Sequence, residues 1–201
     1  MRRLLLSFLF ISSFYHSGSA FGAHAFSLYD TPKYPAGFTH FDYVNPDAPQ
    51  GGELFLANPD RRTSFDKFNP YSMKGVAAAG VSNLMFETLA TSSSDEVATM
   101  YGLLAEDMKL APDRMSMTFR LNSKARFNNG DPVTADDVKH SFDTLVAKGA
   151  PQFKSIFADV RRAVVLERRT VRFDFKALHR ELPLIVGSVP VFSRKWGANT
   201  T

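Results

Sequence analysis

Few residues in this sequence are of types and spacings that could perform chemistry. His40 and Asp42 lie two residues apart in a segment rich in turn formers, and Asp136 and His140 lie four apart in a segment with helical period. Either pair could hold a metal ion or move a proton. A histidine near an aspartate in a loop is more often a structural hydrogen bond, and an i, i+4 pair on a helix is ordinary surface chemistry. Both pairs therefore favour a structural interpretation.

Motifs of known catalytic machinery are missing from the 201 residues. There is no cysteine, no Gly-x-Ser-x-Gly elbow, no His-Glu-x-x-His helix and no glycine-rich phosphate loop. Asp136 and Asp137 are adjacent where a helix should begin, and capping explains both. We therefore expect no enzyme, no metal site and no cofactor. The alternatives to a binding protein are an envelope structural or interaction protein and, less favoured, a hydrolase.

Charge and composition limit the classes of partner that the chain is expected to bind. The chain is 44% hydrophobic and 22% charged, as in soluble globular proteins, and its net charge is +4. Arg2 and Arg3 supply two of those charges, so the remainder is too mildly basic to predict nucleic-acid binding.

The first 25 residues predict a cleavable signal peptide. Arg2 and Arg3 precede an apolar run over 4–15, and small residues follow at 18–20 and 23–25, each a candidate cleavage site. The apolar run is shorter than the roughly 20 residues of a membrane span; an uncleaved anchor is the alternative. With no cysteine for a lipid anchor, we expect a periplasmic protein that does not insert into the membrane after cleavage.

A predicted strand, turn and capped helix must position any functional side chains of this sequence. Residues 116–121 alternate as a half-buried strand does, and Asn129-Gly130 predicts a turn. Thr134 stands at an N-cap position with Asp137 three residues on, and Gly149 follows the apolar helical period as a stop. We also predict a strand over 53–57, a helix over 76–89, a hairpin over 160–167 and 170–176, and a short helix over 182–186.

The order of parts in this unit resembles the signature of the extracellular solute-binding proteins of family 5, the oligopeptide and dipeptide receptors of bacterial ABC importers. The matching positions are Leu121, Phe127, Gly130, Pro132, Thr134, Ala135, Asp137, Val138, Ser141 and Phe142. The aromatic and proline-rich segment from Phe38 to Gly52 resembles the YejA-like branch of that family, associated with uptake of peptides and microcin C.

The resemblance implies an α/β periplasmic binding protein of type II (cluster C), present incompletely. It implies a signal peptide over 1–25, an extended N-terminal arm over 26–52, the start of lobe I over 53–86, a small α+β subdomain over 87–190 and a return to lobe I over 191–201. Because family members are much longer, we expect an N-terminal fragment. The arm is expected to pack on the body through Tyr29, Tyr34, Phe38, Phe41 and Tyr43.

The implied function is capture of a peptide and its delivery to an inner-membrane ABC permease with ATPase subunits, by a monomer. Lys74, Gly75 and Val76 correspond to a loop that touches bound peptide in oligopeptide receptors, and a glycine allows close backbone approach. Phe153 stands where such receptors often place a tyrosine facing the cleft. For Gly75 a turn glycine, and for Phe153 a core side chain, are the alternatives.

Overall fold

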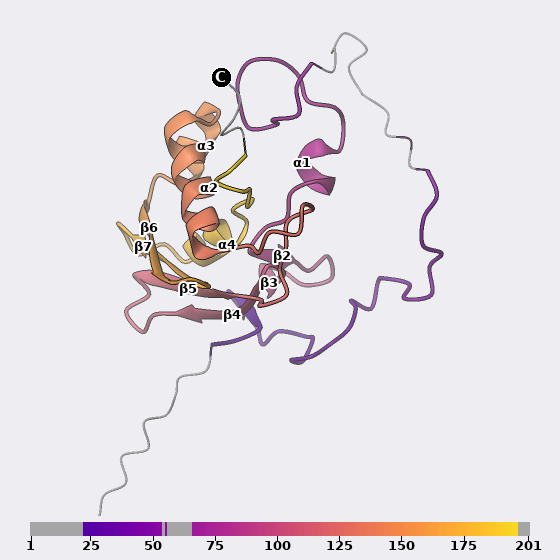
Figure 1. Cartoon of the computed structure of the whole chain (residues 1–201). Coiled ribbons are helices and arrows are strands. Elements are labelled where there is room, and N and C mark those ends of the chain that lie inside the picture. Colours follow the sequence, from indigo (N-terminus) through magenta and orange to yellow (C-terminus); the bar gives the residue numbers. More distant parts are fainter. Residues whose placement is uncertain (1–21, 54, 56–65, 197–201) are drawn as a thin grey trace, which may run out of the picture.

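The computed structural model describes residues 22–53, 55 and 66–196 (Figure 1). Most of the predicted signal peptide and most of the predicted strand over 53–57 lie outside the described residues. The strands are β1 (Ala25–Ser27), β2 (Ala90–Ser92), β3 (Thr99–Gly102), β4 (Ala105–Leu110), β5 (Ser116–Leu121), β6 (Val160–Glu167) and β7 (Thr170–Phe175). The helices are α1 (Val81–Leu84), α2 (Ala135–Lys148), α3 (Pro151–Ile156) and α4 (Leu182–Gly187). The chain is therefore a mixed α/β protein, as predicted.

An antiparallel sheet in the order β4-β5-β7-β6 carries the main core. On β5 the alternate residues Met117, Phe119 and Leu121 are fully buried, and Val171 and Phe173 on β7 are equally buried beside them. This period of two puts one face of the sheet against α2, which lies across it in Figure 1. The predicted hairpin of β6 and β7 is confirmed.

A second sheet, in the order β1-β3-β2, joins the start of the chain to its middle. Tyr34 is buried, and its ring meets Tyr101 of β3 edge-on with centroids 5.5 Å apart. Phe38 and Phe41 pack against the same pair, so the predicted packing of the arm is confirmed for these aromatic residues. Tyr29 is 60% exposed, and Tyr43, 48% exposed, stacks on Phe41.

The turn and capped helix form as predicted. Thr134 is the N-cap of α2, and the Asp137 carboxylate accepts the Thr134 backbone N–H at 3.0 Å to complete the capping box. Gly130 has a φ of 85°, which a glycine adopts without strain in the turn. At the other end the Gly149 N–H donates to the Leu145 carbonyl at 3.0 Å and ends the helix. Local signals were sufficient for this unit.

The predicted helix over 76–89 is wrong for most of its length, because only Val81–Leu84 is helical. Gly80 takes a left-handed φ of 84° and starts the helix abruptly. Ala90 pairs with Gly102 across β2 and β3, which draws the chain into the sheet just after the single helical turn. Leu84 and Met85 are 66% and 64% exposed instead of forming a buried face.

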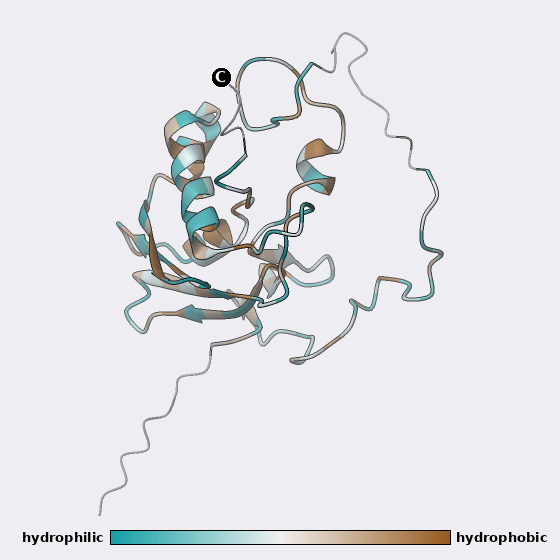
Figure 2. Ribbon diagram, in the orientation of Figure 1, coloured by the Kyte–Doolittle hydropathy of each residue, from teal (hydrophilic) through white to brown (hydrophobic). Residues whose placement is uncertain are grey.

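Hydropathy follows the layers of the fold. Figure 2 shows mainly polar residues on α2, mainly apolar residues on α4 and both kinds on α1. The predicted helix at 182–186 is confirmed as α4, with Pro183 in its first turn. Among the described residues, no helix is both long enough and apolar enough to cross a membrane.

Candidate ligand-binding site

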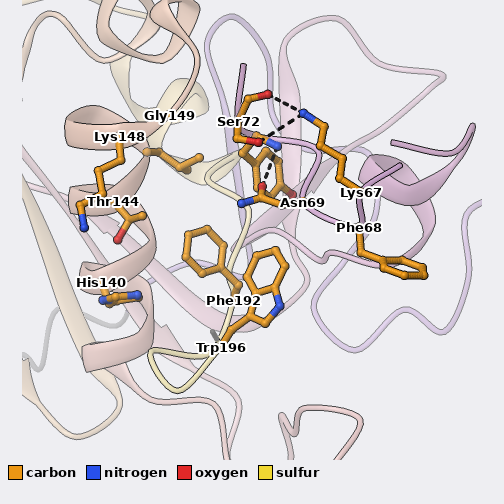
Figure 3. A pocket seen from close by; sticks show the side chains of 12 residues that line it. Lys67, Phe68, Asn69, Ser72, His140, Thr144, Lys148, Gly149, Phe192 and Trp196 are labelled. Atoms are coloured by element: carbon orange, nitrogen blue, oxygen red, sulfur yellow. Dashed lines mark hydrogen bonds between the residues drawn. The ribbon is translucent and has the colours of Figure 1, made fainter. Parts of the chain in front are cut away.

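A pocket of about 560 Å³ lies between α2, the segment 67–72 and the segment 192–196 (Figure 3). These three segments are distant in sequence, and each supplies one side. The lining residues are Lys67, Phe68, Asn69, Tyr71, Ser72, His140, Thr144, Leu145, Lys148, Gly149, Phe192 and Trp196.

The α2 side of the pocket is polar. His140, Thr144 and Lys148 follow one another at intervals of four, which places them on one face of the helix. Figure 3 shows the three side chains on the same side of the pocket, across from Lys67 and Phe68. Lys148 is exposed, and its ammonium group has no partner among the described residues.

The floor of the pocket is aromatic. Phe192 and Trp196 meet edge-on, with ring centroids 5.4 Å apart, and Tyr71 stacks on Phe192 with centroids 6.0 Å apart. Phe192 is 7% exposed and anchored in the core, whereas Trp196 is 43% exposed. An apolar group entering the pocket would therefore meet a fixed ring at its base and an accessible ring at its rim.

Tyr71 carries a buried hydroxyl that has no hydrogen-bond partner among the described residues. Burial raises the pKa of this phenol well above its usual range. The hydroxyl therefore stays protonated at neutral pH, with a hydrogen bond still to give. The Tyr71 carbonyl is used, since it accepts the Ala150 N–H at 2.9 Å and fixes this segment against the start of α3.

The segment 66–76 folds back on itself to form the side opposite α2. Lys67 donates to the carbonyl of Ser72 at 2.6 Å. The Asp66 carboxylate accepts the Val76 N–H at 2.5 Å, and the Asp66 N–H donates to the Val76 carbonyl at 3.1 Å. Both backbone groups of Val76 are thus already paired within the chain.

None of the sequence-predicted ligand residues Lys74, Gly75, Val76 and Phe153 lines this pocket. Lys74 and Gly75 are exposed, and Gly75 has a left-handed φ of 77°. Phe153 is half-buried, and its ring meets Tyr71 edge-on with centroids 5.9 Å apart. Phe153 thus touches one lining residue, whereas the predicted loop follows the lining segment 67–72 along the chain.

Sequence reasoning missed the residues that form the pocket itself. Tyr71, Phe192 and Trp196 come from two segments, and Lys148 comes from the end of a helix assigned only a structural role. A lone tryptophan at 196 in an otherwise polar stretch was the signal available. No local pattern places it beside Phe192 and Tyr71.

The charges at the pocket are of one sign. Its lining holds the cations Lys67 and Lys148, and no acidic residue among the described part of the chain. The described residues also contain no group of three or more His, Asp or Glu side chains that could hold a metal ion. The arrangement suits a ligand in which an apolar group stands next to a negatively charged group.

The sequence profile of the bacterial extracellular solute-binding proteins, family 5 (middle region), matches residues 99–200, just over half of the chain. Two curated proteins of Agrobacterium fabrum align with most of it. The probable peptide-binding protein YejA is 41% identical over 170 residues, 84% of this chain and 27% of that protein. The peptidoglycan-binding protein YepA is 39% identical over 191 residues, 90% of this chain and 31% of that protein.

A solved structure shares the fold. The oligopeptide-binding protein AppA of Bacillus subtilis, in complex with a nonapeptide, superposes with a TM-score of 0.54 at 19% identity, over 67% of this chain and 27% of that one. The chain spans about a quarter to a third of the length of the curated relatives it matches.

Proposed function

Because this chain belongs to the bacterial extracellular solute-binding proteins of family 5, we propose that it acts in the periplasm as the peptide-binding component of an ABC importer. It would deliver its ligand to an inner-membrane permease driven by ATPase subunits. A relative named a probable peptide-binding protein and a similar structure of an oligopeptide-binding protein with a nonapeptide support a peptide as the ligand class.

The observation that carries the proposal is the pocket between α2 and residues 192–196. It offers an accessible aromatic side chain at Trp196, a buried ring at its base at Phe192 and, at Lys148, a cation with no partner among the described residues, which are binding groups and contain no nucleophile with a base. A peptide supplies matching apolar and anionic groups.

We propose that the predicted ligand residues act at the edge of this pocket. Gly75 is exposed, so a peptide could approach its backbone from the solvent side, although the Asp66 carboxylate already fills the place of its missing side chain. Phe153 would contribute through the aromatic cluster that holds Tyr71. Main-chain pairing at Val76 is unfavourable, because Asp66 already occupies both of its backbone groups.

Capture would require closure of further protein surface over the ligand. Trp196 and Phe68 are 43% and 64% exposed, so the pocket formed by the described residues is open to solvent at its rim. Affinity in such receptors comes from contacts that only a closed state makes. Residues 1–201 alone should therefore bind peptides weakly, and submicromolar binding in calorimetry would contradict this mechanism.

A thermal-shift screen tests the ligand class. Mixtures of di- to pentapeptides, the corresponding free amino acids and neutral sugars are compared on the protein as expressed from its gene. Only peptides should raise the unfolding temperature, since a ligand that binds the native state alone stabilises it. Stabilisation by sugars or amino acids with no response to peptides would overturn the proposal, and no response to any ligand would favour an envelope interaction protein.

A cell-wall peptide is the second candidate ligand, because the relative YepA is named a peptidoglycan-binding protein. A microcin C-like peptide is a third, from the likeness to the YejA-like branch. Muropeptides and microcin C added to the same screen would rank these ligands against simple peptides.

A further inference from the structure

We infer that the pocket between α2 and residues 192–196 is a subsite for an aromatic side chain that stands next to a carboxylate. This inference deepens the proposed function and rests on it, since it specifies which peptides the chain selects. It follows from three features of the described residues: the shape of the aromatic floor, the sign of the charges and the groups that remain unpaired.

The aromatic floor selects a flat side chain. The rings of Phe192 and Trp196 are inclined by 68° with centroids 5.4 Å apart, and Tyr71 stacks on the far side of Phe192. Phe86 packs against Trp196 with centroids 5.4 Å apart and holds the indole from behind. An incoming ring could meet the exposed indole face-on or edge-on, the two arrangements that aromatic pairs prefer.

The segment that carries these rings is rigidly held. The Phe192 N–H donates to Ser141 Oγ at 2.9 Å, and the Arg194 N–H donates to the Asp137 carboxylate at 3.0 Å. Both acceptors are buried residues of α2. Because the floor is fixed before a ligand arrives, binding an aromatic group there costs little ordering of the protein.

The charges select a carboxylate. Lys148 stands on the α2 side of the pocket with no partner among the described residues, and Lys67, which gives two hydrogens to Ser72, has a third hydrogen to donate. Lys195 in the neighbouring segment is taken by Asp131 at 2.9 Å, so it does not compete for a ligand. A carboxylate would find a free cation at Lys148 and meet no acidic lining residue among those described.

The two selections fit one ligand. A terminal aromatic residue of a peptide presents its ring and its α-carboxylate on neighbouring atoms, and an internal aromatic residue beside a glutamate presents the same pair. Both sources share the chemistry of a ring next to an anion. Alanine peptides with a free C-terminus carry the carboxylate without the ring, and C-terminally amidated aromatic peptides carry the ring without the carboxylate.

Trp196 is the sole tryptophan of the chain, so its fluorescence reports on this pocket directly. We would titrate the 201-residue chain with alanyl-alanyl-phenylalanine, its C-terminal amide, alanyl-glutamyl-phenylalanine amide and trialanine. The free acid should change the fluorescence saturably. The amide should bind about fivefold to tenfold more weakly, because it lacks one solvated charge-assisted hydrogen bond. Binding of the glutamyl amide at the strength of the free acid would assign the carboxylate to a side chain, and weaker binding would assign it to the terminus.

Substitution of Lys148 provides the second part of the experiment. Lys148→Gln should abolish the difference between the free acid and the amide. Lys109→Gln is the matched control, an exposed lysine on β4 with no partner among the described residues, and should change nothing. Both variants are surface changes that leave the core intact.

The outcomes separate this inference from the proposed function. If peptides raise the unfolding temperature but neither Trp196 fluorescence nor Lys148→Gln distinguishes aromatic acids from trialanine, the subsite is wrong and peptide binding stands. If no peptide acts in either assay, both are wrong. Selective quenching by aromatic acids that Lys148→Gln removes supports the inference.

Discussion

Ser141 and Phe192 are joined through a single hydroxyl group. The Phe192 N–H donates to Ser141 Oγ at 2.9 Å, and the Phe192 carbonyl lies 3.1 Å from the same oxygen. Ser141 is completely buried on α2. A signature helix is thereby bound to the segment that carries the floor of the pocket, and the Arg194 N–H, which donates to the Asp137 carboxylate at 3.0 Å, adds a further hydrogen bond between them.

Ser141→Ala should destabilise the chain because it leaves the buried Phe192 N–H without an acceptor. The expected loss is about 1–3 kcal/mol in the free energy of unfolding, measured by urea unfolding. Ser123→Ala, an exposed serine whose hydroxyl has no partner among the described residues, is the control and should stay within about 0.5 kcal/mol of the parent. Equal effects of the two changes would contradict the role given to Ser141.

Gly75→Ala should strain the loop that we propose meets the ligand. The position has a φ of 77°, and an added Cβ would stand 2.5 Å from Asp66 Oδ1. Gly130→Ala is a matched control, since its φ is 85° but nothing lies within 4 Å of the new carbon. The left-handed backbone alone costs about 1–2 kcal/mol, so Gly75→Ala should cost more than Gly130→Ala in thermal unfolding, and the reverse order would refute the Asp66 contact.

The docking of the arm should loosen in acid. Hydrogen bonds from Lys33, Ser93 and Tyr34 hold the pKa of Asp95 well below its usual range. A carboxyl with a depressed folded pKa stabilises the fold above its unfolded pKa, about 3.9, and that stability is lost as pH falls through the lower folded value. The protection factors of the arm amides, which correct exchange rates for their intrinsic pH dependence, should therefore be constant through neutral pH and fall only below about pH 4.

Lys33→Met tests the cause of that pH dependence. Lys33 Nζ lies 2.6 Å from Asp95 and 2.7 Å from Asp42, so removing it should move the pKa of Asp95 upward and start the acid loosening at a higher pH. Carboxyl titration by NMR measures the pKa itself. An unchanged Asp95 titration in the variant would show that Ser93 and Tyr34 suffice.

Export should remove the chain up to Ala20 and not up to Ala25. Both candidate cleavage sites end in small residues, but residues between the two sites make backbone hydrogen bonds in the folded chain. The Ala23 N–H donates to the Met108 carbonyl at 2.7 Å, and the Gly102 N–H donates to the His24 carbonyl at 2.9 Å. Cleavage after Ala25 would discard these contacts with β3 and β4. N-terminal sequencing of the exported protein should therefore begin at Phe21, and a start at Phe26 would contradict the expectation.

Local signals in the sequence determined the turn and helix from Asn129 to Gly149. A positive φ at Gly130, a cap at Thr134 and its partner Asp137 each satisfy backbone groups a few residues away, so no distant contact was needed to predict them. The hairpin of β6 and β7 was predictable for the same reason. The segment 76–89 was not, because the pairing of Ala90 with Gly102 outweighs a weak helical preference.

The candidate pocket is a product of tertiary structure alone. Its rings come from Tyr71 and from Phe192 and Trp196, and Lys148 supplies a cation that has no partner in the part of the chain that the structure describes. Sequence spacing carries no information about contacts between segments this far apart, whose meeting is fixed by burial and by the Ser141 and Asp137 hydrogen bonds. The sequence thus determined the family and the locally specified elements, whereas packing decided the course of 76–89 and which aromatic and charged side chains face one another.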